Sequence, residues 1–560
     1  MLTESTSGFP DTVNQVGGRF RHWPWLAAIL SGILLTLCFP RWDQAWLAWL
    51  ALTPLIAAVW FGTKTQQDSG ATSTDPTRWQ RFRRFTRMPL ARAFLLGMCS
   101  GLIFFWIVFY WLTNVTVVGW FLLAFPLAAC IGIWAGFLKA SQSVAGDFTR
   151  SGANLRLAFA GATAWTALEW ARSLLGFGWN GLGVALHGNL VAGAGKDWRL
   201  PFMQITEYTG VSGLSFLLAF TNLIVVITAA RFLAEAKNRR VRPHWDFNLT
   251  IALITAVFMF GIRTLWQPEQ PGMPLRVATV QANIPQVQKF DRAFAQKIFD
   301  RYNSLTDFAL AMSPQLLLWP EAATPGALFE NNENFEFVDA VAKRTENFLL
   351  GTLDYDQDGH NYNIAALFTE RGAALQTYRK IHLVPFGEFI PLRHSFPLFA
   401  WIVGEEVPSD FTPGNKYKLL QLSKPELKLA SLICFEDTVG DLTRRFVKEG
   451  AQVLVNVTND GWFKKSAGAE QHLAHAVFRA VENRRPLLRS ANTGMTAFIA
   501  PTGKVIYSKA PFDEGFLFGE VSVPGADARQ TFYTRHGEVF VKACALMSLA
   551  MAGLLFWRRR

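Results

Sequence analysis

Long apolar runs separated by short polar segments make up most of the first half of the chain, and one more run lies near its last residue. A helix needs about 20 mostly apolar residues to cross the ~30 Å hydrocarbon core of a membrane. Runs close to that length lie at 24–40, 44–61, 93–112, 115–138, 157–175, 211–230, 248–266 and 540–557. The pattern therefore predicts an α-helical membrane bundle of about eight spans.

The first run also has features of a signal peptide, because Arg19 and Arg21 precede a short apolar stretch. It ends, however, in Cys38-Phe39-Pro40-Arg41 and offers no small-residue cleavage site. We therefore interpret it as an uncleaved span.

The hydrophobic pattern changes after "QPEQPGMP", a proline-rich linker that follows the seventh run. Short runs rich in Val, Ile, Leu and Phe then indicate buried strands: "LRVATVQANI", "QLLLWPEAA", "NFLLGTLDY", "YNIAALFT", "LKLASLICFED" and "AQVLVNVTND". Helical patterns alternate with them at 291–312, 333–346, 438–449 and 468–484. The alternation predicts an α/β layered domain of about 260 residues, inserted before the last span. We assign residues 1–266 to the bundle, 267–535 to the α/β domain and 536–560 to the last span with a basic tail.

The charges agree with this division. The chain is 51% hydrophobic and 17% charged, with a formal net charge of +12. A topology with the N-terminus inside places five segments in the cytoplasm, and together they carry +13, which leaves −1 for the rest: 1–24, 62–92, 139–156, 231–247 and 558–560. The excess follows the positive-inside rule and leaves no basic surface for nucleic acid. It also places the α/β domain outside the cytoplasm, and the protein is either a membrane enzyme or a transporter.

One cysteine stands apart from the other four. Cys38, Cys99, Cys130 and Cys544 fall in predicted spans, where each is expected to be a small packing residue. Cys434, in "LICFED", is the one cysteine of the outer domain. In an oxidising compartment an unpartnered thiol is either buried and inert or kept for its reactivity, and the sequence leaves both open. Its position at the end of a strand favours reactivity, because α/β folds carry chemistry there.

A nucleophilic thiol needs a base and a positive group that stabilises the developing oxyanion. Two other segments of the domain supply such groups: "LLLWPEAATP" contains Glu321, and "YRKIHLVPFGEFIP" contains Lys380, His382 and Glu388. A single Glu or Lys is normally a solvated surface residue. Here both segments are densely apolar, and an unpaired charge among such residues would be costly. We therefore retain Glu321 and Lys380 as candidates.

The order Glu321, Lys380, Cys434 resembles the Glu-Lys-Cys triad of the nitrilase superfamily. The stretches "RKIHLVPFGEFIPL", "NVTNDGWF" and "RRPLLRSANTG", on a membrane chain of this layout, resemble the bacterial apolipoprotein N-acyltransferase family. The resemblance covers 20–557 and is strongest over 275–505. It implies that the α/β domain is a nitrilase-like αββα sandwich.

The resemblance also implies the reaction. Cys434 would be the nucleophile, Glu321 the general base, and Lys380 the cation that stabilises the tetrahedral intermediate. A fatty acyl chain would pass from a phospholipid to Cys434 as a thioester. From there it would pass to the N-terminal S-diacylglyceryl-cysteine of a lipoprotein. The implied setting is the bacterial inner membrane, with the catalytic domain in the periplasm, a monomeric protein and no cofactor.

Supporting roles follow from the same resemblance. Glu388 would support the lysine and the acyl transfer, Glu436 would orient the site, and the backbone N–H of Phe435 would add to the oxyanion hole. "NDGW", with Asn459 and Trp462, reads either as a tight turn or as a wall of the active site, and the resemblance favours the wall.

The chain departs from its relatives at two aromatic positions. Many relatives have Tyr at the place of Phe435 and Trp at the place of Phe290. Both substitutions keep the ring and lose a hydrogen-bond donor, and neither affects the thiol chemistry.

A lipid entrance is expected near Phe290, Phe399 and Trp401. The apolar stretch "FPLFAWIVG" at 396–404 is either a core segment or an interfacial lid that dips into the outer leaflet.

His472 and His475 lie three residues apart on a predicted helix, a spacing that some metal sites use. No third ligand stands nearby, and "EQHLAHAVFRAVEN" has the pattern of an ordinary amphipathic helix, so we expect no metal.

Two rival functions share parts of this pattern. A membrane-anchored amidase of the nitrilase type would use the same triad on a small amide. A transporter with a ligand-binding outer domain would need charges along its path, and apart from Glu169 the spans hold few. We therefore expect an acyltransferase with a phospholipid donor and a lipoprotein acceptor.

Overall fold

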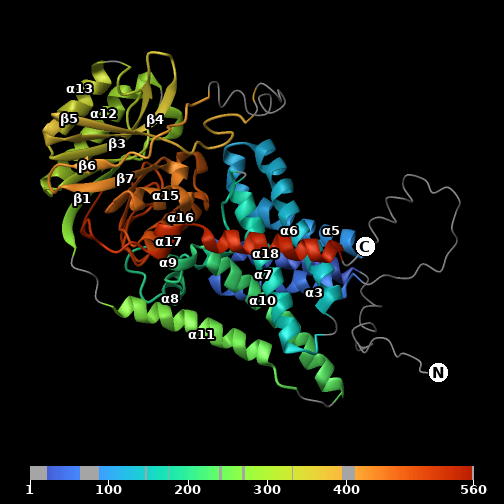
Figure 1. Ribbon diagram of the computed structural model, residues 1–560. Coiled ribbons are helices and arrows are strands. Elements are labelled where there is room, and N and C mark those ends of the chain that lie inside the picture. Colours follow the sequence, from blue (N-terminus) through green and yellow to red (C-terminus); the bar gives the residue numbers. More distant parts are fainter. Residues whose placement is uncertain are drawn as a thin grey trace, which may run out of the picture.

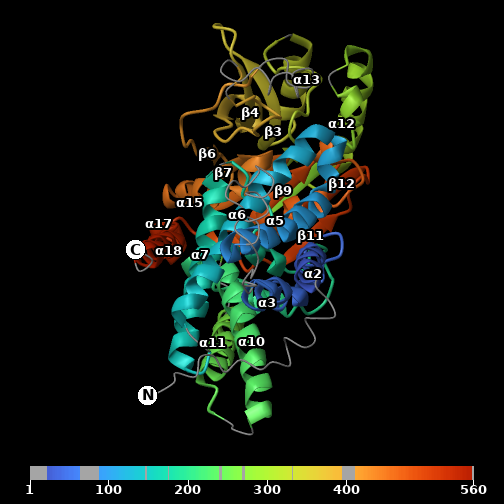
Figure 2. The same ribbon diagram turned by 90° about the vertical axis from the view of Figure 1, so that its right-hand side faces the viewer.

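The computed structural model describes most of the chain: residues 22–63, 88–145, 148–174, 176–238, 242–267, 272–289, 291–330, 332–391, 393 and 410–557. Long helices form a bundle on one side of the molecule, and two β-sheets with their covering helices lie on the other side (Figures 1 and 2). Phe290 and the stretch 396–404, with Phe399 and Trp401, lie outside the described residues.

Five helices of the described chain are long and apolar enough to cross a membrane. They are α5 (Pro89–Val108), α6 (Val117–Ala145), α10 (Ser212–Asn238), α11 (Trp245–Trp266) and α18 (Val539–Trp557). The three other predicted spans coincide with α2 (Trp23–Leu37), with η1 (Ala45–Trp49) plus α3 (Thr53–Phe61), and with α7 (Ser151–Leu174). The first two are shorter, and α7 carries Arg156, Glu169 and Arg172. The number of eight spans therefore stays a prediction.

Helix α11 runs along the outside of the bundle (Figure 1) and buries few of its side chains. It crosses α8 (Arg199–Met203) at Gly261. A Cβ atom at Gly261 would lie 1.8 Å from the carbonyl oxygen of Pro201, so only glycine allows this approach.

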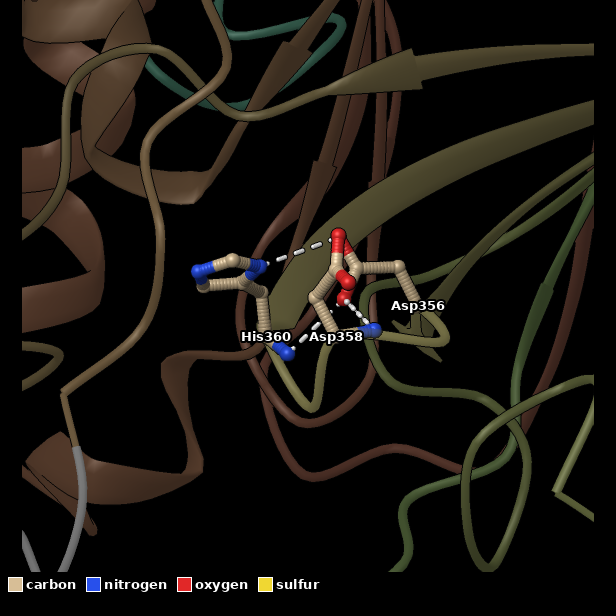
Figure 3. A group of neighbouring side chains, drawn as sticks. All are labelled: Asp356, Asp358 and His360. Atoms are coloured by element: carbon tan, nitrogen blue, oxygen red, sulfur yellow. Dashed lines mark hydrogen bonds and ion pairs between the residues drawn. The ribbon is translucent and has the colours of Figure 1, made fainter.

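The first sheet has the strand order β12-β1-β2-β3-β4-β5. Its strands are β1 (Met273–Gln281), β2 (Leu316–Trp319), β3 (Asn347–Tyr355), β4 (Asn361–Thr369), β5 (Ala374–Arg379) and β12 (Gly515–Val523). β1, β2 and β3 are parallel, and the outer strands pair antiparallel. The turn between β3 and β4 carries Asp356, Asp358 and His360 (Figure 3).

The second sheet has the order β11-β10-β9-β8-β7-β6. Its strands are β6 (Leu420–Leu422), β7 (Leu427–Ile433), β8 (Val453–Thr458), β9 (Leu487–Ala491), β10 (Thr496–Ile499) and β11 (Val505–Lys509). β7, β8 and β9 are parallel, again between antiparallel outer strands. The two parallel trios bring the carboxyl ends of β2, β7 and β8 to one edge of the sandwich.

The sheets pack face to face between two pairs of helices. Leu316 and Leu318 of β2 belong to the core shared with the second sheet, whereas Leu317 and Trp319 pack on the helix side. α12 (Ala295–Ala311) and α13 (Asn332–Ala342) cover the first sheet, and α15 (Gly440–Lys448) and α16 (Gly468–Asn483) cover the second. This is the αββα sandwich that the resemblance implied.

The expectation that 468–484 is an ordinary amphipathic helix is wrong. Every residue of α16 except Glu470 is buried. One side of α16 packs on the sheet, and another contacts α9 (Thr206–Thr209) and η3 (Leu182–Leu186), which belong to the first half of the chain. Its polar side chains therefore have partners inside the protein instead of facing water.

Six of the twelve strands were predicted: β1, β2, β3, β4, β7 and β8. The other six were not, and the expected helices at 291–312, 333–346, 438–449 and 468–484 all have counterparts. The strands run from Met273 to Val523, while the domain boundaries at 266/267 and 535/536 stay predictions.

Candidate active site

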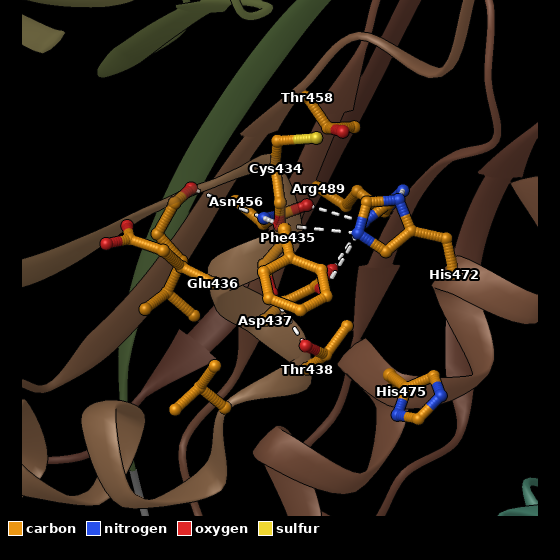
Figure 4. A network of polar contacts seen from close by, with 12 residues as sticks. Cys434, Phe435, Glu436, Asp437, Thr438, Asn456, Thr458, His472, His475 and Arg489 are labelled. Atoms are coloured by element: carbon orange, nitrogen blue, oxygen red, sulfur yellow. Dashed lines mark hydrogen bonds and ion pairs between the residues drawn. The ribbon is translucent and has the colours of Figure 1, made fainter. Parts of the chain in front are cut away.

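Cys434 follows β7 directly and opens η7 (Cys434–Thr438). Its backbone is left-handed, with a φ of 51°, which costs a non-glycine residue roughly 1–2 kcal/mol. Its carbonyl oxygen is held by Asn456 Nδ2 at 3.2 Å and His472 Nε2 at 3.3 Å. This sharp turn directs the sulfur toward Thr458 at the end of β8 (Figure 4).

Glu321 lies two residues beyond the end of β2 and is nearly buried. One carboxylate oxygen accepts a hydrogen bond from Asn363 Nδ2 (2.8 Å), and the other accepts one from the backbone N–H of Asn459 (2.9 Å). Both oxygens are thus fixed, one by the first sheet and one by the second.

Lys380 lies directly beyond β5 and is 1% exposed. Its Nζ lies 2.8 Å from the carboxylate of Glu388 and 3.8 Å from Oε1 of Glu321. Burial lowers the pKa of the Lys380 ammonium, but the carboxylates of Glu388 and Glu321 raise it more, so that it ends above its ordinary value. The lysine is therefore a permanent cation. Its partner Glu388 also accepts a hydrogen bond from Asn363 Nδ2 (2.9 Å).

The thiol of Cys434 is protonated in this setting. Burial raises its pKa well above the ordinary value, and the charge of Glu321 raises it further, whereas Lys380 and the hydrogen bond with Thr458 lower it. A thiol with a raised pKa needs a base to become a nucleophile. Thiol, carboxylate and ammonium together have the composition required for nucleophilic acyl transfer.

Glu436 joins the lysine to the nucleophile turn. Its carboxylate accepts hydrogen bonds from the Tyr378 hydroxyl (2.8 Å) and from the backbone N–H groups of Ile381 (2.7 Å) and His382 (3.1 Å). Its other oxygen accepts from the N–H of Ile433 (2.9 Å). Burial raises the pKa of Glu436 to about 7. The fully buried side chain fixes the segments on either side of the site.

A buried charge network lies beneath the nucleophile turn (Figure 4). Arg489 pairs with Asp437 (2.6 Å) and Asp460 (3.0 Å), and His472 pairs with the same two carboxylates (2.9 Å each). All four side chains are at most 1% exposed. Two cations and two anions therefore balance one another directly below Cys434.

Residues from the first half of the chain reach this network through α16. Three donors share the side-chain oxygen of Gln471: Trp111 Nε1 (3.0 Å), Trp179 Nε1 (3.2 Å) and Asn180 Nδ2 (3.0 Å). The Gln471 amide donates to the carbonyl oxygens of Pro40 (2.8 Å) and Val108 (3.1 Å). The helical bundle is thus hydrogen-bonded to the residue next to His472.

Two family models match the chain: the Apolipoprotein N-acyltransferase N-terminal domain over residues 31–224 and Carbon-nitrogen hydrolase over residues 276–530. The apolipoprotein N-acyltransferase of Geobacter metallireducens is 32% identical over 548 residues, which cover 96% of each chain. The chain belongs to the apolipoprotein N-acyltransferase family.

The apolipoprotein N-acyltransferase of Bradyrhizobium diazoefficiens is also 32% identical, over 81% of this chain and 80% of its own. Among solved structures, Saccharomyces cerevisiae Nit3, a member of branch 10 of the nitrilase superfamily, aligns with 45% of this chain and 91% of its own at 17% identity and a TM-score of 0.36. The Carbon-nitrogen hydrolase match extends over the sandwich, so this member of the apolipoprotein N-acyltransferase family has the predicted nitrilase-like fold. It is an acyltransferase.

The structure brings together most of the residues that the sequence singled out. Asn459 joins the site through its backbone and through Nδ2, which donates to Gln286 Oε1 (2.7 Å). Trp462, in η8 (Asp460–Phe463), is 47% exposed at the rim. Phe435 stacks on Trp179 at 6.4 Å, so its ring faces a residue of the first half of the chain.

Sequence reasoning missed two polar side chains of this apolipoprotein N-acyltransferase site. Asn363 bridges Glu321 and Glu388 from within β4, and its signal was an amide in the otherwise apolar run "YNIAALFT". Lys289, after η4 (Gln286–Gln288), donates from Nζ to the carbonyl oxygen of Glu321 at 2.7 Å. Nothing in "QVQKFD" marks it as buried.

His472 and His475 do not share a metal site among the described residues. His472 belongs to the charge network, and His475 Nε2 accepts from the backbone N–H of Asn180 (3.2 Å), with the two rings apart in Figure 4. The described chain brings three potential metal ligands together at Asp356, Asp358 and His360, in the turn between β3 and β4 (Figure 3). There Asp356 already accepts from the backbone N–H groups of the other two, as in an ordinary turn.

Proposed function

We propose that the chain transfers a fatty acyl chain from a phospholipid to the α-amine of the S-diacylglyceryl-cysteine at a lipoprotein's N-terminus. The observation that carries the proposal is the cluster of half-buried Cys434 with buried Glu321 and Lys380 at the edge of a sandwich that is hydrogen-bonded to apolar helices. Membership of the apolipoprotein N-acyltransferase family supplies the class of donor and acceptor.

In the first half-reaction Glu321 takes the proton of the Cys434 thiol. The thiolate attacks the ester carbonyl carbon of the phospholipid, and the negative charge moves to the carbonyl oxygen. Lys380 stabilises this oxyanion, together with the backbone N–H of Phe435. The carbon–oxygen ester bond then breaks, Glu321 returns the proton to the leaving alkoxide, and lysophospholipid departs from a thioester.

In the second half-reaction the lipoprotein amine attacks the thioester carbonyl carbon. Glu321 accepts a proton from the amine, the carbon–sulfur bond breaks, and the thiolate of Cys434 recovers a proton. An amide on the lipoprotein and the free enzyme result. Glu388 supports Lys380 in both halves, and Glu436 maintains the distance between lysine and nucleophile.

Lipid access is supported by the loops around Glu321. Three apolar side chains on different segments next to the active site are exposed: Val287 in η4, Phe386 two residues before Glu388, and Trp462 in η8. Exposed apolar side chains around an active site suit an acyl donor that leaves the bilayer only at about 0.8 kcal/mol per CH₂. We place the protein in a bacterial inner membrane as a monomer. The distribution of basic segments supports an orientation with the sandwich in the periplasm.

The test is a covalent adduct. Purified protein given phospholipid without lipoprotein should gain the mass of one fatty acyl chain on Cys434, and neutral hydroxylamine should remove it. Cys434→Ala should form none, whereas Cys130→Ala should behave as the wild type. Lys380→Ala and Glu321→Gln should slow adduct formation by about 10²–10³, since each removes one group that acts in the transition state.

Adding a diacylglyceryl-lipoprotein should discharge the adduct onto its amine and give ping-pong kinetics. An adduct that forms without Cys434 would contradict the proposal. Rapid release of free fatty acid with no amine product would instead favour a hydrolase, the amidase-like alternative.

A further inference from the structure

The carbonyl oxygen of Cys434 and the N–H of Phe435 belong to one peptide unit. A trans peptide is planar, so its C=O and its N–H point in opposite directions. The bond between Cys434 and Phe435 is not among the cis peptides of the described chain. The contacts that hold the Cys434 carbonyl oxygen therefore also fix the direction of the Phe435 N–H, which the proposed function assigns to the oxyanion.

Two buried side chains hold that carbonyl oxygen (Figure 4). Asn456 donates to it from Nδ2 at 3.2 Å, and His472 donates to it from Nε2 at 3.3 Å. A carbonyl oxygen can only accept, so the proton of the second bond lies on Nε2. Both donors come from outside the nucleophile turn, because Asn456 lies in β8 and His472 in α16.

The orientation of both donors is fixed by further contacts. The amide oxygen of Asn456 accepts from Arg489 Nη1 at 2.5 Å, and its amide nitrogen also donates to the carbonyl oxygen of Leu432 at 3.3 Å. Nδ1 of His472 lies 2.9 Å from Asp460 Oδ1, which directs Nε2 toward the turn. Side chains locked by such contacts hold a neighbouring group in one orientation.

The turn needs this support because its backbone is strained. Cys434 has a φ of 51°, in the left-handed region that residues other than glycine rarely adopt. Such a conformation persists only where the surroundings over-determine it. Without the two donors the peptide unit would be free to rotate toward a relaxed conformation, and the N–H of Phe435 would turn with it.

The N–H of Phe435 is not used by its own helix. Phe435 is the second residue of η7, and the first N–H groups of a helix have no acceptor within it. Hydrogen bonds at the carbonyl end of a peptide also polarise it and strengthen the bond that its N–H donates. The two side chains therefore both direct and strengthen this donor.

We propose that Asn456 and His472 are positioning residues for the oxyanion site: by holding the carbonyl oxygen of Cys434, they direct the N–H of Phe435 toward the developing negative charge. This inference rests on the proposed function, because it takes Cys434 as the nucleophile and that N–H as a donor to the tetrahedral intermediate. Both side chains act through the peptide unit and not on the acyl group itself.

The experiment compares two reactions of the Cys434 thiolate in the purified full-length protein. Acylation by phospholipid passes through an oxyanion. Alkylation by iodoacetamide does not, because the sulfur displaces iodide from a saturated carbon and no carbonyl oxygen gains charge. Both rates are followed by the mass of the peptide that contains Cys434, and their ratio reports on the oxyanion site.

Asn456→Ala removes one of the two donors without adding charge. Loss of a whole oxyanion donor costs about 10²–10³ in rate, so loosening it should slow acylation by about tenfold or more. Alkylation should change little. His472→Asn should act in the same way, because its shorter side chain does not reach the turn, whereas the longer amide of His472→Gln can replace Nε2 and should restore much of the acylation rate.

Asn347→Ala is the matched control. Asn347 is fully buried at the amino end of β3, and its Nδ2 donates to the backbone carbonyl oxygens of Gln315 (2.8 Å) and Lys424 (2.9 Å). The variant loses the same kind of contact away from the triad, so its ratio should equal that of the wild type. Unfolded molecules of any variant form a separate fast phase of alkylation and do not enter the ratio.

A ratio unchanged in both Asn456→Ala and His472→Asn would overturn the inference, whether the two rates stay at the wild-type values or fall together. Equally slow acylation in His472→Gln and His472→Asn would overturn the assignment of His472. Asn456→Ser replaces Asn456→Ala if the latter does not fold. A wild type that is alkylated at Cys434 but never acylated would contradict the proposed function instead, so the two failures are distinguishable.

Discussion

The buried charged side chains beneath Cys434 each contact side chains of opposite charge. The carboxylate of Asp460 has its pKa lowered to about 2: burial raises it, but Arg489 and His472 lower it more. For His472, burial lowers the pKa, but Asp437 and Asp460 raise it to about 9. The imidazolium form of His472 is therefore part of the folded structure at neutral pH.

Stability should fall as pH rises through the titration of His472. Its pKa of about 9 in the folded protein exceeds the ordinary 6.5, so its contribution is fully present below pH 6.5 and is lost by pH 9. A difference of this size corresponds to about 3 kcal/mol. The free energy of unfolding in detergent, measured between pH 6 and 9.5, should decline more steeply with pH for the wild type than for His472→Gln.

His475→Gln is the matched control on the same helix. Burial lowers the pKa of His475, so that it is neutral throughout this range, and the variant should keep the decline. An equally steep decline in His472→Gln would mean that another group carries the pH dependence.

Glu321 and Cys434 could be chosen from the sequence because each follows or ends an apolar strand, where a charge or thiol is conspicuous. Lys380 could be chosen because its segment "YRKIHLVPFGEFIP" is otherwise densely apolar. Lys289 and Asn363 could not be chosen in this way. Their chemistry depends on partners 32 and 42 residues from them along the chain, and such pairings are decided by sheet register. The six strands predicted from the sequence did not show how the strands pair, so this register could not be predicted.

The strands that sequence reasoning found contain long, mostly buried apolar runs. β2 and β8 are entirely buried and read as unbroken apolar runs. β12 alternates buried and exposed residues along its second half, and β6 is three residues long. Short or one-sided strands at sheet edges resemble loops in sequence, so β6 and β12 were missed. β9 is fully buried, but Arg489 and Ser490 interrupt its apolar pattern, so it was missed as well. The layered class was still predicted correctly.

The interpretation of α16 as an amphipathic surface helix was wrong, and Gln471 shows the reason. A glutamine on a predicted surface helix is normally solvated. Here it is 1% exposed and satisfies groups from the bundle on one side while the sheet covers the other. A sequence pattern shows which residues of a helix are polar. It does not show whether their side chains form hydrogen bonds with water or with other parts of the protein.

Replacing Gln471 by methionine should weaken the junction between bundle and sandwich. Three buried N–H groups and two carbonyl oxygens lose their partner, and each unsatisfied buried group costs about 1–3 kcal/mol. Because several groups can shift toward other acceptors, we expect a loss of about 3–5 kcal/mol in the free energy of unfolding. Slower acylation of Cys434 should accompany it, since His472 is the next residue.

Glu470→Gln, one residue earlier on α16, tests whether any change on this helix has the same effect. Glu470 is half-buried, and the substitution preserves its shape, so stability and acylation should both change little. A stable Gln471→Met with normal acylation would show that the junction is held by apolar packing alone.

The orientation of the whole molecule in the membrane follows from the charge distribution. A reporter active only in the periplasm should work when fused near residue 420 and fail when fused near residue 80 or 240. The physical reason is the +13 carried by the predicted cytoplasmic segments. Reporter activity at residue 80 would invert the topology and put Cys434 in the cytoplasm.

The nearly complete burial of α16 also bears on how the enzyme can be handled. A secreted sandwich produced without the helical bundle would expose Gln471, the residues that contact Trp179 and a broad apolar face to water. It would be expected to aggregate. The helical half is therefore more than an anchor for a self-sufficient hydrolase. A detergent that extracts this protein has to replace the lipid around the bundle without disrupting the contacts of α16 with α9 and η3.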